Sequence, residues 1–306
     1  MTKSGRIQRE LSKCVRVPTN DTHRSGYRVT LTNGDFLILD TGKEDAVDVW
    51  RSSDRGAHWA CVCDSTGMKV HWSCSDACVL PNGDVIVIGL VHGDRGTMDD
   101  NNVWRSRDGG VHWEVICPIT PWVMRYCASL VVLGNGTLVY AGGYINDYKG
   151  LNDVWSSTDG GVSWRKVCEN AAWCPRFNHL LVATTDNNLV LMGGQCARKS
   201  MNQFDVWRSC DGGRTWHLVC PEADWMRYGY LDAVSLANGT IVLLCGDGGT
   251  WLSNDEGMTW SNVPHKGLPW GKGCHGLTTT TSRNTVLFEN ADAFWTWDAR
   301  EYLGSL

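Results

Sequence analysis

One short phrase, Ser-x-Asp-x-Gly-x-x-Trp, occurs five times along the chain. It ends at Trp59, Trp113, Trp164, Trp216 and Trp260, so successive copies are 54, 51, 52 and 44 residues apart. A repeat of about fifty residues indicates one supersecondary unit copied in series, because each unit buries its apolar face only against its neighbours. The repeat therefore constrains the fold more than the composition does.

The phrase has the chemistry of a tight turn between two antiparallel strands. Val-Trp precedes it in four copies, beginning at Val49, Val103, Val154 and Val206, and both residue types favour strands. Glycine adopts a positive φ without penalty and an aspartate side chain accepts backbone N–H bonds, so Asp and Gly together mark the turn. Each unit predicts four strands, which in the third unit cover residues 127–133, 137–141, 153–157 and 163–168.

The phrase resembles the Asp-box, or BNR repeat, of sialidases and other propeller proteins. The rest of the unit is similar to a kelch repeat, in which an Arg is followed by a strand, a Gly-Gly pair and a Trp strand. Arg125, Gly142-Gly143 and Trp155 show this order in the third unit. The combined resemblance covers almost the whole chain and implies an all-β, distantly sialidase-like β-propeller.

The spacing predicts a six-bladed β-propeller of four-stranded antiparallel blades, forming one domain over residues 1–306. The expected blades cover residues 24–63, 69–117, 125–168, 176–220, 227–264 and 270–298, and the last of these lacks a fourth strand. Four units close with Trp-x-x-x-Cys, and Cys14 stands in the same register one repeat upstream. The segment Arg9–Val15 is therefore predicted to complete the last blade, which removes exposed sheet edges.

The composition limits the classes of partner and compartment. A formal net charge of −5 weighs against a general nucleic-acid binder. No apolar run approaches the roughly 18 residues of a membrane helix, and residues 1–10 lack the apolar stretch of a secretory signal. We expect an intracellular protein, or one of a virus particle assembled there, without membrane insertion. Five of the 14 cysteines recur at one strand end, as buried apolar residues would, so most thiols are expected to be reduced.

A basic residue recurs where each innermost strand is expected to begin. These residues are Arg24, Arg125, Arg176, Arg227 and Lys272. Three residues further on stand His179 and His275 in the fourth and last units. A ring of cations at the channel mouth would bind a carboxylate, sulfate or phosphate, or an acidic side chain of a partner. The alternative is that each Arg bonds to carbonyls or carboxylates of a neighbouring blade and only holds the ring together.

Carboxylates occur at two kinds of position. Asp40 and Glu289 replace a glycine of the common pattern near the mouth, and with Tyr230 they are the candidates for acid/base chemistry. Ion pairing with neighbouring cations is the alternative. The carboxylates of the repeated phrase are expected on the opposite side of each blade, where they have a structural role. They are Asp54, Asp108, Asp159, Asp211 and Asp255.

The sequence predicts a non-catalytic binding or scaffold propeller that engages a protein partner or an anionic ligand at the channel mouth. No nucleophile–base motif, phosphate loop, metal cluster or cofactor motif is visible, so an enzyme is not favoured. One alternative is a sialidase-like glycoside hydrolase, in which Arg125, Arg176 and Arg227 would hold a substrate carboxylate. Another is a lectin-like glycan binder. The partner and the oligomeric state stay open.

Overall fold

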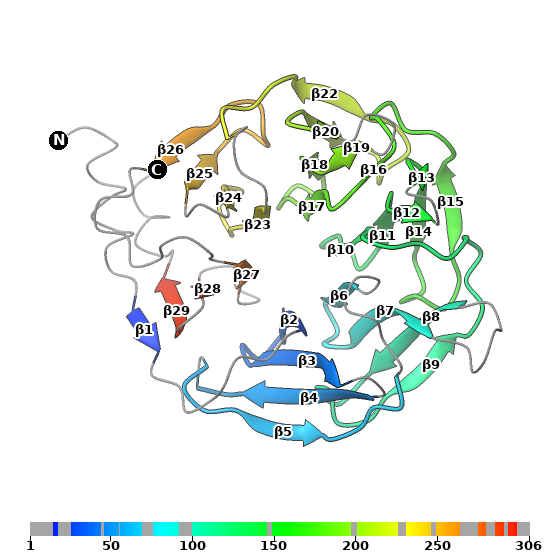
Figure 1. Cartoon of the computed structure of the whole chain (residues 1–306), viewed down its shortest axis with the longest axis vertical. Coiled ribbons are helices and arrows are strands. Elements are labelled where there is room, and N and C mark those ends of the chain that lie inside the picture. Colours follow the sequence, from blue (N-terminus) through cyan, green and yellow to red (C-terminus); the bar gives the residue numbers. More distant parts are fainter. Residues whose placement is uncertain are drawn as a thin grey trace.

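The computed structural model describes residues 15–17, 26–43, 46–54, 56–68, 76–91, 100–145, 149–196, 201–225, 231–245, 249–263, 275–279, 285–290 and 293–298. All regular structure in these segments is β-strand, which confirms the predicted all-β class. Among the residues described, no helix has the length and apolar character that crossing a membrane requires. Figure 1 shows the strands as sheets standing around a ring.

Five antiparallel sheets, here called blades 1 to 5, each take four strands from one continuous stretch of chain. Blade 1 contains β2 (Gly26–Thr30), β3 (Phe36–Lys43), β4 (Ala46–Ser52) and β5 (Ala60–Cys63). Blade 2 contains β6 (Asp76–Val79), β7 (Val85–Val91), β8 (Asp100–Ser106) and β9 (Glu114–Cys117). Blade 3 contains β10 (Ser129–Val132), β11 (Leu138–Ala141), β14 (Val154–Ser157) and β15 (Arg165–Cys168).

Blades 4 and 5 continue the same order. Blade 4 contains β17 (Leu180–Ala183), β18 (Leu189–Met192), β21 (Val206–Ser209) and β22 (His217–Cys220). Blade 5 contains β23 (Leu231–Ser235), β24 (Ile241–Cys245), β25 (Thr250–Ser253) and β26 (Ser261–Val263). The prediction of four antiparallel strands in each repeat is therefore confirmed.

The predicted ring of six repeats needs correction at its junction. Within the described segments, blades built from one stretch of chain number five, because the described C-terminal residues supply three strands: β27 (His275–Thr279), β28 (Thr285–Asn290) and β29 (Ala293–Asp298). The fourth strand of this composite sheet is β1 (Val15–Val17), in which Arg16 pairs with Trp295. Val15 is the one residue of the predicted segment Arg9–Val15 that lies within the described residues, and β1 continues beyond it to Val17. The two valines of β1 favour strand structure.

Two small sheets stand apart from the blades and were not predicted. The strands β12 (Tyr144–Ile145) and β13 (Lys149–Gly150) form a hairpin between the second and third strands of blade 3. The strands β16 (Arg176–Phe177), β19 (Gln195–Cys196) and β20 (Met201–Asn202) form a three-stranded sheet at the same level of blade 4. Both lie at the end of the ring where the innermost strands begin, which we call the mouth.

The innermost strands define a central channel. Around the ring, β2, β6, β10, β17, β23 and β27 each contact the next, and β27 contacts β2 again (Figure 1). The apolar cores lie between neighbouring sheets. One such core joins Val139 and Val154 of blade 3 to Leu181 and Leu191 of blade 4, with the fully buried Trp173 beside them. The large tryptophans therefore fill space between blades, as their size and apolar surface favour.

The glycine of the repeated phrase contacts the Val that precedes Trp in the blade before it. Gly257 has φ +89°, and a Cβ at this position would lie 2.6 Å from Cγ1 of Val206. Gly213 has the same φ, and its Cβ would lie 2.8 Å from Cγ1 of Val154. Glycine is therefore needed both for the turn and for the close approach of two blades. This contact links two recurring features of the sequence, Val-Trp and Asp-x-Gly.

Candidate functional site

Each copy of the repeated phrase folds into a hydrogen-bonded turn between the third and fourth strands of its blade. In blade 4, Ser209 Oγ accepts the N–H of Gly213 at 2.9 Å and donates to Asp211 at 2.8 Å. Asp211 accepts the N–H of Thr215 at 2.9 Å, and Trp216 Nε1 donates to the Gly213 carbonyl at 3.0 Å. The polar atoms of the phrase are thus engaged with one another. The turn lies at the end of the blade opposite the mouth.

The carboxylates of the other copies make the same contacts. Asp54, Asp108, Asp159 and Asp255 each accept a Ser hydroxyl and a backbone N–H. The N–H of His58 is the largest cause that lowers the pKa of Asp54 to about 2. These carboxylates are therefore ionised acceptors inside a turn.

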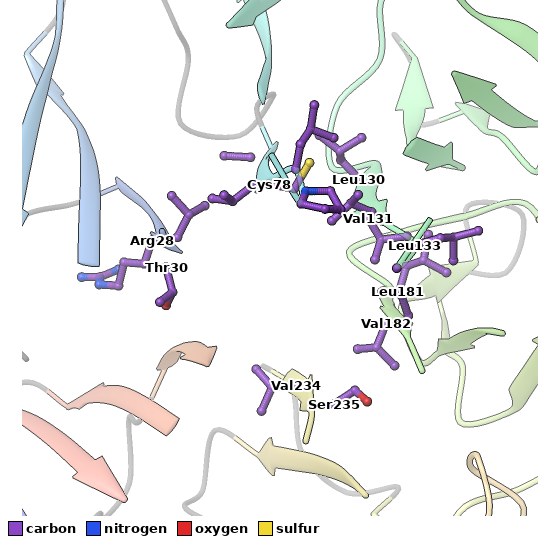
Figure 2. Close-up of a pocket in the computed structure, with 18 of the residues that line it drawn as sticks. Arg28, Thr30, Cys78, Leu130, Val131, Leu133, Leu181, Val182, Val234 and Ser235 are labelled. Carbon is purple, nitrogen blue, oxygen red and sulfur yellow. The ribbon is translucent and has the colours of Figure 1, made fainter. Parts of the chain in front are cut away.

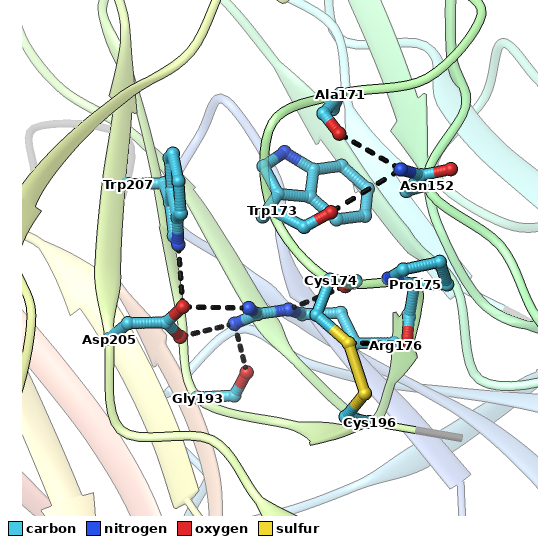
Figure 3. Close-up of a disulfide and its surroundings, with 10 residues drawn as sticks. All are labelled: Asn152, Ala171, Trp173, Cys174, Pro175, Arg176, Gly193, Cys196, Asp205 and Trp207. Atoms are coloured by element: carbon cyan, nitrogen blue, oxygen red, sulfur yellow. Dashed lines mark hydrogen bonds and ion pairs between the residues drawn. A yellow bond between two sulfur atoms is a disulfide. The ribbon is translucent and has the colours of Figure 1, made fainter. Parts of the chain in front are cut away.

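Arg125 and Arg176 lie inside their blades and do not face the channel. Arg176 is fully buried, and its guanidinium donates to both carboxylate oxygens of Asp205 at 2.6 and 2.9 Å and to the Gly193 carbonyl at 2.9 Å (Figure 3). Trp207 Nε1 also donates to Asp205 at 2.7 Å. Burial alone would raise the pKa of Asp205, but the hydrogen bonds and positive charge of Arg176, together with the hydrogen bond from Trp207, outweigh burial and lower this pKa.

The predicted ligand-binding role of these two arginines is therefore corrected. Arg125 makes the equivalent bidentate contact with Asp153, at 2.6 and 2.9 Å, and is 1% exposed. Both guanidinium groups bond within their own blade, so they do not bridge neighbouring blades as the alternative supposed. The sequence carries the signal for this contact, because an Asp precedes Val-Trp at both Asp153 and Asp205.

A disulfide lies beside the Arg176 contact. Cys174 and Cys196 are bonded, which joins the segment before β16 to β19 (Figure 3). Arg176 Nε donates to the Cys174 carbonyl at 3.1 Å, so the disulfide and the ion pair hold the same segment. Nine further cysteines among the described residues are free thiols.

His179 is buried between blades 3 and 4 and does not line an open site. It is 3% exposed, and its ring lies against Gly142, where a Cβ would come within 2.6 Å of His179 Cε1. Burial, with the nearby charge of Arg176 as a second cause, lowers the pKa of His179 to about 3. The imidazole is therefore neutral at physiological pH and packs as a core side chain.

The other predicted site residues fall into two groups. Arg24, Arg227, Lys272 and Tyr230 lie outside the described residues. His275 and Glu289 are described as strand residues, and they face each other as register partners in β27 and β28. Asp40 is half-buried at the mouth end of β3, where it pairs in register with Gly26 and Asp48. Asp40 and Glu289 therefore belong to different sheets.

Two carboxylates at the mouth were not predicted. Asp76 begins β6 and pairs with Ile88, and Asp232 in β23 pairs with Leu244. Asp76 and Asp232 occupy equivalent positions in their blades. Their partners Ile88 and Leu244 each pair with the residue that precedes the Trp of the third strand. Since β10 and β17 separate β6 from β23 on one side, and β2 and β27 on the other, the two carboxylates occupy opposite sides of the channel.

Asp76 is held by the backbone of the next blade. Its carboxyl group accepts the N–H of Leu130 at 2.6 Å and the N–H of Ala77 at 2.8 Å. Burial raises the pKa of Asp76 to about 7, although these two hydrogen bonds oppose the shift, and the negative charge of Asp232 adds to it. A carboxyl group that is partly protonated near neutral pH can act as a general acid. A second carboxylate in the same opening can act as a base.

Below the carboxylates the channel forms a cavity of about 500 Å³. Residues of β2, β6, β10, β17 and β23 line it, and Figure 2 shows Arg28 and Thr30 on one side and Val182 on another. Apolar residues form much of the wall, including the buried Cys78, whose pKa is raised by burial. Within the described part of the chain, no group of three or more His, Cys, Asp or Glu residues is arranged to hold a metal ion.

The comparisons with known proteins concern the fold. A family model described as the DUF6242 beta propeller domain matches residues 134–227. A solved structure of YjhT is 14% identical, with a TM-score of 0.67, and covers 92% of this chain and 95% of its own. The fold is a β-propeller. No curated protein gives a significant match to the chain.

Two further structural neighbours of this propeller are glycoside hydrolases. An α-L-arabinanase from Penicillium chrysogenum, complexed with arabinobiose, is 15% identical over 94% of this chain and 98% of its own, with a TM-score of 0.64. A mutant of the α-L-arabinofuranosidase arb93a from Fusarium graminearum, in complex with an iminosugar inhibitor, is 14% identical over 94% and 97%, also with a TM-score of 0.64. At this identity the similarity establishes the fold alone.

Proposed function

We propose that this propeller binds a carbohydrate at its mouth and hydrolyses a glycosidic bond, with Asp76 and Asp232 as the acid/base pair. Glycoside hydrolysis needs one carboxylic acid to protonate the leaving oxygen and a second carboxylate to assist attack. The observation that carries the proposal is the pKa of Asp76, raised to about 7 at the channel mouth. The similarity in fold to an arabinanase and an arabinofuranosidase supports the same class of substrate.

The roles follow from the placement of the two carboxylates. Asp76 donates its proton to the glycosidic oxygen, because its protonated form is present near neutral pH. Asp232 stands on the opposite side of the channel and activates the attacking water. Carboxylates that lie on either side of a sugar with room for a water molecule give inversion at the anomeric carbon. The buried arginines have no part in this scheme, so an acidic sugar is not required.

The test uses the whole chain and a panel of nitrophenyl glycosides and arabinan oligosaccharides. Asp76→Asn and Asp232→Asn are each expected to lower kcat by about 10²–10⁴-fold, the usual contribution of general acid–base catalysis. Asp186→Asn changes an exposed carboxylate in the turn between β17 and β18, at the other end of the channel, and should leave the rate unchanged. No turnover of any glycoside, or wild-type rates in both mouth variants, would refute the proposal.

The pH profile gives a second test. The rate should fall above pH 7 as Asp76 loses its proton, since the pKa of that group is about 7. Asp232→Asn removes a negative charge that helps to raise this pKa, so the alkaline limb of the residual activity should move to lower pH. An alkaline limb that does not move would show that a group other than Asp76 is titrating.

A non-catalytic binding propeller is the second candidate. The observation that favours it is that both oxygens of Asp76 accept backbone N–H groups, from Ala77 and Leu130. In blade 3 the position equivalent to Asp76 is Ser129, whose hydroxyl donates to the His179 carbonyl of blade 4 at 2.8 Å. Side chains at this position therefore also join neighbouring blades. In this case the mouth would retain a glycan, an anionic ligand or a protein partner without cleaving it. A glycan array and co-purification from the native source would detect such binding.

The repeated phrase itself is assigned to the Asp-box class, and the order of Arg, Gly-Gly and Trp to the kelch-like class. The hydrogen bonds shared by Ser209, Asp211, Gly213 and Trp216 support the first assignment. The contact of Arg176 with the Gly193 carbonyl supports the second. Neither class defines a reaction, so the proposed activity depends on the mouth alone.

A further inference from the structure

Three aromatic rings form a continuous cluster at the mouth, over blades 3 and 4. The rings of Tyr126 and Tyr144 are stacked, with centroids 5.2 Å apart and planes 27° apart. Tyr144 also contacts Phe177, with centroids at 4.7 Å. Tyr126 and Tyr144 are half-buried, whereas Phe177 is buried beneath them at 9% exposure. We call these three residues the aromatic platform.

The backbone that carries the platform is tied together across the two blades. Tyr126 and Tyr144 exchange both backbone hydrogen bonds, at 2.8 and 2.9 Å, and the N–H of Gly143 donates to the Arg176 carbonyl at 2.9 Å. Phe177 pairs in register with Gln195 of β19. The rings are therefore held in place before any ligand arrives, which lowers the entropy lost on binding.

The buried arginines position the platform. Arg125 and Arg176 immediately precede Tyr126 and Phe177, so each ion pair fixes the residue before a platform ring. The residues after these rings, Cys127 and Asn178, both have φ 52°. A left-handed conformation is unfavourable for a non-glycine residue, and such conformations concentrate at functional sites. The structure thus maintains an unfavourable backbone at both ends of the platform.

The described residues beside the platform are polar and carry little charge. Exposed residues on the adjoining small sheets and turn are Lys149, Asn178, Gln195 and Asn202. Apart from the buried Arg176, Lys149 is the one charged residue in β12, β13, β16, β19 and β20. Amide groups both donate and accept hydrogen bonds, which matches hydroxyl groups. A nucleic acid is disfavoured, because its phosphates need a basic surface and this chain has a formal charge of −5.

The buried tryptophans provide a contrast. Trp122 also contacts three aromatic rings, among them Tyr140 and Trp155, but it is 6% exposed. Ring clusters of that kind fill the core between blades. The platform differs because two of its rings keep accessible surface, and exposed amide residues occur on the adjoining strands and turn.

We propose that Tyr126 and Tyr144 form a binding subsite for a neutral sugar unit of an extended oligosaccharide whose scissile bond lies at the channel mouth. The apolar C–H face of a sugar packs on an aromatic ring, and nearby amides bond its hydroxyl groups. The position of the platform fits, because it lies close to a residue that bonds to the proposed catalytic acid. The N–H of Leu130 donates to Asp76, and Leu130 follows Tyr126 by four residues, so the Cα atoms of Tyr126 and Leu130 lie within about 14 Å. This inference rests on the proposed function for the class of ligand, and it adds that long chains are preferred to short ones.

The test measures binding of arabinan oligosaccharides of increasing length by calorimetry. It uses the Asp76→Asn variant, in which turnover is expected to be too slow to consume the oligosaccharide during the titration. Tyr126→Ala and Tyr144→Ala are expected to raise Kd for the longer oligosaccharides by about tenfold, the equivalent of one ring-stacking contact. Tyr126→Phe and Tyr144→Phe keep the ring and should bind within about threefold of the parent. Val123→Ala changes a side chain that is 59% exposed close by in the chain, and it serves as the control.

The outcomes separate the platform from the catalytic proposal. If no glycoside is cleaved but long oligosaccharides bind in a tyrosine-dependent way, the hydrolase proposal fails and the platform stands. If hydrolysis occurs but the alanine variants bind long chains like the parent, the platform is refuted and the hydrolase stands. Absence of oligosaccharide binding by the folded parent also refutes the platform. Should an alanine variant unfold, Tyr126→Leu and Tyr144→Leu retain apolar bulk, and the same tenfold loss is expected of them.

Discussion

Replacing Arg176 by Ala is expected to destabilise the protein strongly. The guanidinium is fully buried and makes two bonds to Asp205, one to the Gly193 carbonyl and one to the Cys174 carbonyl. Its removal leaves the half-buried Asp205 carboxylate, whose side chain is 18% exposed, with a hydrogen bond from the N–H of Trp207 but without its bidentate partner. Removing one member of a buried ion pair costs about 3–5 kcal/mol, because the other charge is left uncompensated. We expect a loss of that size in the free energy of unfolding.

The double variant Arg176→Met with Asp205→Leu separates the two causes of this loss. It removes both charges and keeps apolar volume, so it should be more stable than Arg176→Ala. The control is Arg165→Ala, because Arg165 is exposed on β15 and such changes usually stay within about 0.5 kcal/mol. Denaturant unfolding followed by the fluorescence of the 17 tryptophans measures all three. An Arg176→Ala protein that unfolds like the parent yet fails to bind a ligand would refute the structural role.

Three further changes test other contacts. Glu256 has φ 56°, and its carboxylate accepts a hydrogen bond from Thr184 of blade 4. Both Glu256→Ala and Glu256→Gly lose this bond, but glycine relieves the left-handed backbone, so the Ala variant should be less stable by about 1 kcal/mol in denaturant unfolding. Equal stability of the two variants would contradict this. Gly142→Ala places a Cβ 2.6 Å from His179 Cε1 at a residue with φ +65°. The free energy of unfolding is expected to fall by about 1–3 kcal/mol in the same assay. An unchanged midpoint would contradict this, because it would show that the side chains between blades 3 and 4 accommodate the added methyl group. The pKa of Asp76 is raised to about 7 in the folded protein, so its contribution to stability is present below its unfolded pKa and is lost as the pH rises to 7. Unfolding at a series of pH values should therefore show a decline between pH 4 and 7 that Asp76→Asn lacks.

The repeated turns were predictable because their chemistry is local. Asp211, Gly213 and Trp216 lie within a few residues of one another, and each makes its hydrogen bonds inside the same turn. The strand-forming segments, such as Val-Trp, are separated by turn residues within each repeat, and this pattern predicted four strands in each blade. The continuation of the closing strand to Val17 was not predicted, because a single Cys in register says little about which neighbouring residues pair.

The role of the arginines was misjudged because recurrence has two explanations. An Arg at the same place in several repeats can face a shared ligand or can repeat an internal contact. Asp153 and Asp205 decide between them, since each receives a bidentate bond from the Arg of its own blade. Their own recurrence before Val-Trp carried that information, but only their distance from the guanidinium makes it evident.

The sequence by itself determined the unit of structure, its turns and the apolar strands that pair within it, because these depend on residues close together in the chain. Only the closed ring of the tertiary structure brings together the side chains that lie at the mouth. Asp76 and Asp232 come from opposite blades, and Tyr126, Tyr144 and Phe177 from two neighbouring ones. No local pattern marks these residues as partners, since burial and charge at each depend on side chains supplied by other blades.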